Sequence, residues 1–171
     1  MSDRLVIDSL DFVRNAGSHH GKIPLAEFTR LHDLLFDQEG ELIYQISGQF
    51  DKNEKPCLYI EITGKIHLHC QRCLDKLVSP LDLQTFLILA ENEAELDLAD
   101  EDDTIDAILA TPNLDVVNLI EDEVILNLSI ASHHADGECS MFKPQSSNNN
   151  VTDTTQSAHP FAALAALKKI N

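Results

Sequence analysis

The sequence has no apolar run that approaches the ~20 residues a membrane-spanning helix needs. Its first residues, Met-Ser-Asp-Arg, also lack the apolar stretch of a secretory signal peptide. The sequence therefore predicts a cytoplasmic protein that has no membrane partner. In that compartment the four cysteines are expected to be free thiols or metal ligands rather than a disulfide framework.

Positive charge is also scarce in this chain. The chain has 12 Lys and Arg residues and 29 Asp and Glu residues, which gives a net charge of −17. From Leu77 to Phe142 there are 16 acidic residues and no Lys or Arg, so this window holds nearly all of the net charge. Because so acidic a surface repels phosphate, broad nucleic-acid binding through this face is not expected, whereas a basic protein partner is favoured. The alternative interpretation is that these side chains only keep the protein solvated.

Several patterns typical of enzymes and ion-binding loops are missing. The sequence contains no glycine-rich phosphate loop and no convincing Ser, His and Asp arrangement. The stretch from Glu91 to Asp106 has nine carboxylates in sixteen residues, but it lacks the glycine turn and the ligand spacing of a calcium loop. We interpret this stretch as a solvated acidic loop or a weakly structured insertion.

The chemical feature that the sequence does contain is a cysteine pair, Cys70 and Cys73, at the end of an alternating strand. A Cys-x-x-Cys pair can bind one soft metal ion or close a small disulfide. Downstream, His134 and Cys139 would complete a Cys3His set, which suits a closed, structural zinc site. The fold would have to bring the two halves together across 60 intervening residues. The alternative is that Cys70 is a small buried hydrophobic residue.

Alternating apolar and polar residues predict a β-sheet around this pair. A first strand is expected over Leu42–Phe50, with a turn at Asp51–Pro56. The clearest alternation runs from Leu58 to Leu68 and predicts an antiparallel partner with one buried face. Gly64 within it indicates a bulge. Leu81–Leu89 would supply a third strand.

The opposite face of the Leu58–Leu68 strand gathers basic side chains. Lys65, His67 and His69 share this face, and Arg72 and Lys76 follow closely. These five residues are candidate contacts for RNA phosphates, with a salt-dependent affinity. A solvated polar strand face is the other interpretation.

Helices are predicted at three places. Asp8 can begin one, and an amphipathic helix is expected over Leu25–Phe36 after a loop at Gly17–Gly21. Asp115 can cap a third helix, which would run to about Leu128 and lead the chain to the second half of the metal set.

These segments predict an α+β domain over residues 1–142, in which an antiparallel or barrel-like sheet packs with two or three helices. Residues 143–159 are rich in Ser, Asn, Thr and Gln and predict a flexible linker. Residues 160–171 predict a short C-terminal helix, which would dock on the domain or insert into a groove of a partner.

Four separated motifs resemble those of the bacterial large ribosomal RNA subunit accumulation protein YceD family. They are Cys70-Gln-Arg-Cys73-Leu, Leu119-Ile-Glu-Asp-Glu-Val-Ile-Leu-Asn-Leu128, the His134-x4-Cys139 segment and Pro160-Phe-Ala-Ala-Leu-Ala-Ala-Leu-Lys-Lys169. The resemblance implies a cytoplasmic, non-enzymatic factor that promotes accumulation or processing of 23S ribosomal RNA. Its partner would be large-subunit RNA or a pre-50S particle, or a basic ribosomal protein.

An enzymatic alternative is a dithiol oxidoreductase that uses Cys70 and Cys73. In such enzymes a helix N-terminus activates the first thiol, and here Arg72 could lower a thiol pKa. Against this, the preceding strand alternates, and the chain lacks the βαβ setting in which that motif occurs. The sequence therefore favours a binding module.

Overall fold

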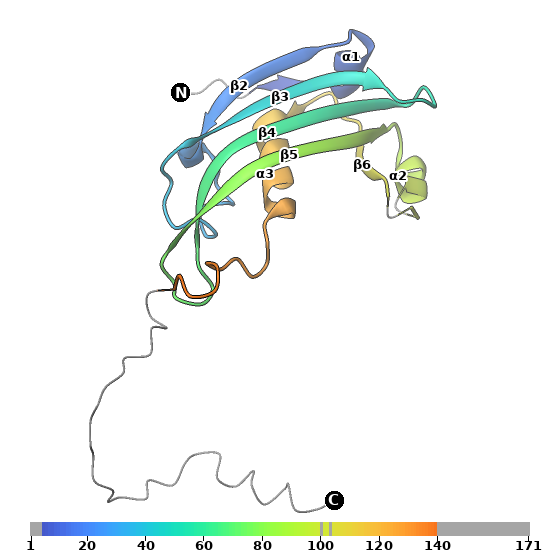
Figure 1. Ribbon diagram of the computed structural model, residues 1–171. Helices are drawn as coiled ribbons and strands as arrows, with labels where there is room; N and C mark the ends of the chain where they lie inside the picture. The colour runs from blue at the N-terminus through green and yellow to red at the C-terminus, as the bar shows by residue number, and fades with distance from the viewer. Residues whose placement is uncertain (1–4, 100, 103, 140–171) are drawn as a thin grey trace, which may run out of the picture.

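The computed structural model describes residues 5–99, 101–102 and 104–139. These residues form a five-stranded sheet of order β2-β3-β4-β5-β6 and a two-stranded sheet of β1 and β7 (Figure 1). Three α-helices accompany the sheets, which confirms the predicted α+β class. In chain order the elements are β1 Val6–Ile7, α1 Ser9–Arg14, β2 Ser18–Pro24, a 3-10 turn Leu25–Glu27, β3 Glu41–Phe50, β4 Pro56–His69, β5 Lys76–Ala90, α2 Glu93–Ala99, β6 Asp106–Leu109, β7 Leu114–Asp115 and α3 Val116–Asn127.

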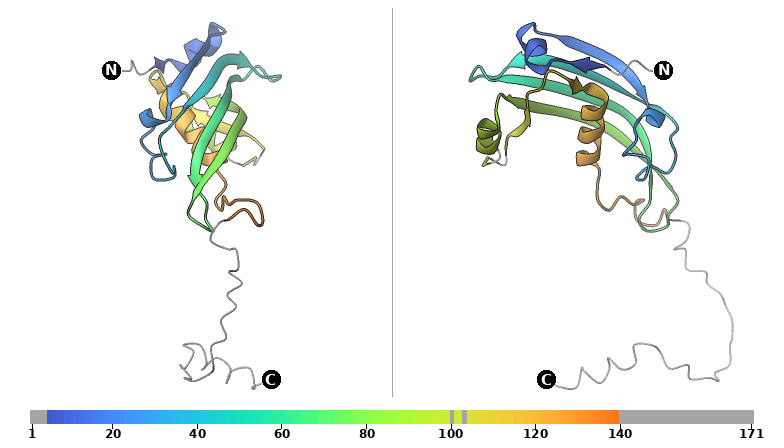
Figure 2. Two further views of the ribbon diagram at one scale, coloured as in Figure 1. Left: turned by 60° about the vertical axis from the view of Figure 1, so that its left-hand side comes forward. Right: turned by 180° about the vertical axis from the view of Figure 1, so that it is seen from behind.

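Strands β3, β4 and β5 form the antiparallel centre of the large sheet, as their alternation predicted. On β4 the apolar side chains from Leu58 to Leu68 face one side and are at most 5% exposed. Helix α3 lies across this side, and the sheet curves over it (Figure 2). The core therefore lies between the sheet and α3, because each presents an apolar face to the other.

The large sheet is open in the described part of the chain. Strands β2 and β6 lie at its two ends, so the barrel-like form that the sequence also allowed is not adopted. Strand β6 runs parallel to β5, and the connection between them contains α2. A parallel neighbour needs such a crossover. The acidic stretch predicted as a loop thus contains a short helix.

The predicted helix over Leu25–Phe36 is wrong. Only the 3-10 turn forms, and Phe28 ends it in an extended conformation. Four apolar residues of the segment are still buried, namely Leu25, Phe28, Leu31 and Leu35, whereas Leu34 and Phe36 are exposed. Tertiary hydrogen bonds replace helical ones, since the N–H groups of Arg30 and Leu31 donate to the carboxylate of Glu121.

Two further local predictions are wrong. Residues 18–21, expected in a loop, belong to β2, where His19 stacks on Tyr44 of β3. Gly64 marks no bulge, because it pairs in continuous register with Leu42 and Leu81. A Cβ atom there would lie 2.6 Å from a methyl group of Leu42, so glycine permits a close approach of side chain to backbone.

The predicted helix starts at Asp8 and Asp115 are confirmed. Each residue caps its helix through its carboxylate, Asp8 to the N–H of Asp11 and Asp115 to the N–H groups of Val117 and Asn118. These caps satisfy N–H groups that the helices leave free. The Asp115 cap fixes the start of α3, and with it the direction in which the chain leaves toward residue 139.

The predicted linker at 143–159 and the predicted C-terminal helix at 160–171 lie outside the described residues. Within the described ranges, none of the helices combines the length and the apolar character that crossing a membrane requires.

Candidate metal centre

The turn between β4 and β5 positions the first two ligands. Cys70 follows the last residue of β4, and its N–H donates to the carbonyl of Asp75 at 3.0 Å. The N–H of Leu74 in turn donates to the carbonyl of Cys70 at 2.8 Å, with Leu74 in the left-handed region at φ 62°. This tight turn places Cys70 and Cys73 on the same side, where both are buried.

The segment after α3 brings the other two ligands to this turn. The N–H of Gln71 donates to the carbonyl of Ser132 at 2.8 Å. The guanidinium of Arg72 donates to the carbonyl of His134 at 3.2 Å. Polar contacts from the turn therefore hold the segment before Cys139 in place. In this way the fold brings His134 close to Cys73, although 60 residues separate them in the sequence.

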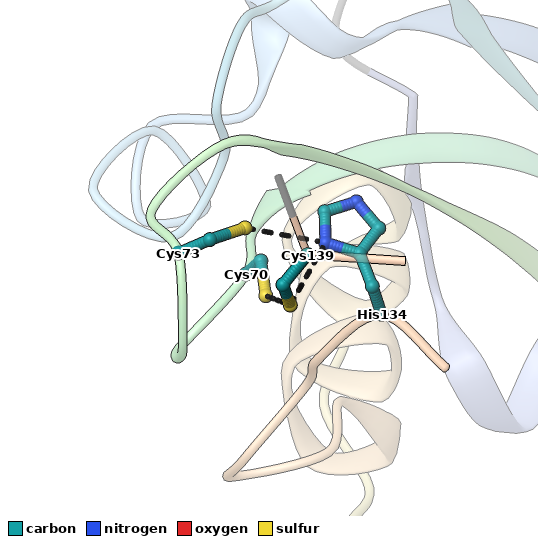
Figure 3. Close-up of side chains that lie close together, drawn as sticks. All are labelled: Cys70, Cys73, His134 and Cys139. Carbon is teal, nitrogen blue, oxygen red and sulfur yellow. Dashed lines mark hydrogen bonds between the residues drawn. The ribbon is translucent and has the colours of Figure 1, made fainter. Parts of the chain in front are cut away.

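Cys70, Cys73, His134 and Cys139 form one compact cluster (Figure 3). One sulfur or nitrogen atom from each lies within 4.8 Å of the others. Sγ of Cys70 is 3.8 Å from Sγ of Cys139, and Nδ1 of His134 is 3.4 Å from Sγ of Cys73 and 3.8 Å from Sγ of Cys139. The thiols are at most 3% exposed. The predicted four residues are thus brought together.

These separations fit a tetrahedral zinc ion. With Zn–S bonds of about 2.3 Å and a Zn–N bond of about 2.0 Å, tetrahedral angles place two sulfurs about 3.8 Å apart and a sulfur and nitrogen about 3.5 Å apart. The orientation of His134 also fits, because its Nε2–H donates to the carbonyl of Lys76 at 3.1 Å. This bond leaves Nδ1 as the free ligand atom, as outer hydrogen bonds do for metal-binding histidines.

The electrostatics of the cluster favour a cation. Burial raises the pKa of Cys70, but backbone hydrogen bonds from Cys73, His134 and Arg72 and the thiol of Cys73 outweigh it and lower the pKa to about 5. Burial, and then the sulfurs of Cys70 and Cys73, raise the pKa of Cys139 to about 11. The thiolate form, which binds metals, is therefore favoured first at Cys70.

The fourth cysteine lies outside the cluster. Cys57 is buried near the start of β4, and its thiol donates to the carbonyl of Gln49 at 3.2 Å. Burial raises the pKa of this thiol. Cys57 thus behaves as a packed, protonated residue.

The five candidate RNA contacts lie along β4, in the β4–β5 turn and at the start of β5, but several have partners within the chain. Asp37 lies between two of them, 2.6 Å from Nδ1 of His67 and 2.8 Å from Nζ of Lys76. The ring of His69 packs on Phe36 with ring centroids 5.1 Å apart. This set is therefore less basic than its sequence indicates.

The remaining two candidates differ in their surroundings. Arg72 lies 3.2 Å from the carboxylate of Asp136 and also donates to the carbonyl of His134, so it contacts the segment that carries His134 and Cys139. Lys65 is exposed on β4. Direct binding of RNA by this surface stays a prediction.

Asp37 gives the protein a defined pH dependence. Hydrogen bonds with Lys76 and then His67 hold the pKa of Asp37 well below its usual value of 3.8. A depressed carboxyl pKa stabilises the fold above the unfolded pKa and loses this effect as the pH falls below it. In thermal unfolding, Asp37→Asn is therefore expected to be less stable than the wild type between pH 5 and 7, with a difference that narrows below about pH 4.

The exposed residue Asp33, four positions earlier, supplies a matched control. Asp33→Asn removes the same charge and is expected to follow the wild type at every pH. Equal pH profiles for the two variants would contradict the role given to Asp37.

The structure also identifies a buried carboxylate that the sequence did not single out as structural. Glu121 of α3 is 1% exposed and accepts from the N–H groups of Arg30 and Leu31 at 2.6 and 3.0 Å. Nε of Arg30 adds a third contact at 3.1 Å. These hydrogen bonds hold the irregular segment after β2 against α3. The chain continues from the end of α3 to His134 and Cys139 of the cluster.

Comparison with known proteins gives one kind of match. A family model described as "Large ribosomal RNA subunit accumulation protein YceD" matches residues 58–168, which is more than half of the chain. All four residues of the cluster lie within this stretch. No curated protein and no solved structure matches the chain.

Proposed function

Because the chain belongs to the YceD family, we propose that it is a non-enzymatic factor that promotes accumulation of large-subunit ribosomal RNA. It would act in the cytoplasm as a binding module for a component of the immature large subunit. We infer the biological role from the description of the family. We infer a binding module from the arrangement of the cysteine cluster.

The zinc ion belongs to this proposal. The observation that carries it is the meeting of Cys70 and Cys73 with His134 and Cys139 at separations that suit one tetrahedral ion. Bound there, zinc would supply a cross-link between the β4–β5 turn and the segment that follows α3. Structural zinc sites are closed in this way, with four protein ligands and no position for substrate.

The surroundings of the thiols support a non-enzymatic role. A dithiol oxidoreductase needs a nucleophilic thiol that its substrate can reach. Here Cys70 is fully buried and Cys73 is 2% exposed, and both lie in a turn between strands rather than at a helix N-terminus. An insulin-reduction assay checks this point, because robust activity that is lost in Cys70→Ser would establish the enzymatic alternative.

The charge distribution favours a basic ribosomal protein as the direct partner. The window from Leu77 to Phe142 carries 16 acidic residues and no Lys or Arg. Among the candidate RNA contacts, His67, Arg72 and Lys76 lie against carboxylates of the chain itself. Acidic surfaces attract basic proteins and repel phosphate backbones.

Crosslinking in cells, followed by purification of the tagged full chain, tests the proposal. We expect basic large-subunit proteins to be retained after nuclease treatment, and Lys65→Glu to retain them equally well. Depletion of the protein should lower the ratio of 23S to 16S RNA. Retention of RNA without any ribosomal protein would favour direct RNA binding, and normal 23S levels after depletion would refute the biological role.

A further inference from the structure

A second site lies between α3 and the end of the sheet formed by β5 and β6, away from the cysteine cluster. It is a cavity of about 740 Å³. Its polar lining includes Asp106, Glu123 and Asn127, and its apolar lining includes Leu87 and Leu126. No Lys, Arg or His contributes to its wall among the residues that the structure describes.

Two buried carboxylates on α3 have opposite environments. Glu121 is 1% exposed and its charge is balanced by Arg30 and by two backbone N–H groups. Glu123 is 6% exposed, yet within the described part of the chain it has no cationic neighbour. A buried charge is costly unless a partner balances it, so Glu123 is compensated far less than Glu121.

The neighbours of Glu123 increase this imbalance. Burial raises the pKa of Glu123, the hydroxyl of Thr85 lowers it, and the negative charges of Asp106 and Asp122 raise it again. The Thr85 hydroxyl is thus a hydrogen-bond partner but supplies no positive charge. A cation that entered the cavity would balance Glu123 and Asp106 together.

We infer that this cavity, here called the α3–β6 cleft, receives an arginine side chain from a basic protein partner. A guanidinium can bind carboxylates through paired hydrogen bonds, which suits Glu123 and Asp106. The aliphatic stem of arginine packs on apolar surface, which suits Leu87 and Leu126. The size of the cavity leaves room for the neighbouring part of an extended segment.

This inference rests on the proposed function, because it names the place at which a basic ribosomal protein is bound. It also identifies one carboxylate, that of Glu123, through which the acidic stretch from Leu77 to Phe142 would select its partner. Most carboxylates of this stretch are exposed and attract a basic partner only over a distance, whereas Glu123 is desolvated. Interactions with a desolvated charge are strong and determine which partner stays bound.

The test uses a fluorescent Gly-Ser peptide that carries three arginines, and the same peptide with neutral citrulline in their place. Binding to the full chain is measured by fluorescence anisotropy at about 0.15 M salt, where exposed charges are largely screened. The variants are Glu123→Gln and, as a matched control, Glu93→Gln on α2, which removes an equal but exposed charge. Thermal unfolding of both confirms that they are folded.

We expect Glu123→Gln to weaken binding of the arginine peptide about tenfold or more, and Glu93→Gln to weaken it less than about twofold. The citrulline peptide should bind none of the three proteins. Equal weakening in the two variants would show diffuse attraction and overturn the inference. It would equally be overturned if the wild type bound an RNA oligonucleotide but no arginine peptide.

Purification from cells separates this inference from the proposed function. If the wild type and Glu123→Gln retain basic ribosomal proteins equally, the α3–β6 cleft is not the binding place, while the proposed function stands. If the wild type retains none, a basic ribosomal protein is not the direct partner, while the role in accumulation of 23S RNA is tested separately by depletion.

Discussion

We expect the Cys70→Ser variant to be purified with almost no zinc, whereas the wild type carries about one ion per chain. Cys70 is the buried thiol whose pKa is lowered to about 5, so it is the ligand that binds most readily as a thiolate. Because the binding energy of a structural zinc ion contributes to folding, its loss should lower the free energy of unfolding by at least about 3 kcal/mol. Elemental analysis and chemical denaturation measure the two effects.

Cys57→Ser is the matched control for this prediction. It makes the same chemical change at a buried cysteine that lies outside the cluster and hydrogen-bonds to Gln49. The control should retain its zinc, because no ligand is altered. A zinc content that falls equally in both variants, or in neither, would contradict the assignment of the ligands.

The second large effect is expected from Glu121→Ala. The substitution leaves the N–H groups of Arg30 and Leu31 without their acceptor and removes the buried partner of the Arg30 guanidinium. Each buried N–H group that is left without an acceptor costs about 1–3 kcal/mol, and the lost ion pair adds little because the Arg30 side chain is 48% exposed. Chemical denaturation should show a loss of this size, with the irregular segment from Phe28 to Leu35 becoming more accessible to hydrogen exchange.

Asp122→Ala tests the second ion pair of Arg30, which lies at the surface. Asp122 also pairs with the guanidinium of Arg30, but its side chain is 51% exposed. Exposed ion pairs contribute about 0–1 kcal/mol, so this variant should be close to the wild type. Equal losses in the two variants would show that burial of Glu121 is not what makes the contact important.

The regular elements could be predicted because their own residues determine them. The alternation from Leu58 to Leu68 gave the buried face of β4, and the carboxylate of Asp115 gave the start of α3. The cysteine set was predictable from its residue types, because Cys and His residues at these spacings are typical of zinc sites. Its assembly depended on backbone contacts such as Gln71 with Ser132, which leave no sign in the sequence.

The wrong predictions concern segments that distant residues control. Leu25–Phe36 has the spacing of a helix, but the carboxylate of Glu121, about ninety positions away, takes two of its N–H groups. The residues of β2 do not alternate between apolar and polar, and they form a strand because they pair with β3. Local propensity is a weak guide in such places, because tertiary contacts override it.

The five basic residues around the β4–β5 turn show that function is as hard to predict from sequence as these segments were. Lys65, His67, His69, Arg72 and Lys76 are adjacent in the sequence pattern and predict a basic surface. The structure adds Asp37 between His67 and Lys76, from a segment that the sequence assigned no role. Charges can be counted from a sequence, but their partners are known only from the fold.

X-ray absorption at the zinc edge, measured on the purified full chain, tests most directly the claim that one metal ion joins the β4–β5 turn to the segment after α3. We expect about one zinc ion per chain, with three sulfur atoms at about 2.3 Å and one nitrogen at about 2.0 Å. A protein that takes up no zinc when it is added, or a zinc ion surrounded by oxygen and nitrogen alone, would contradict this claim.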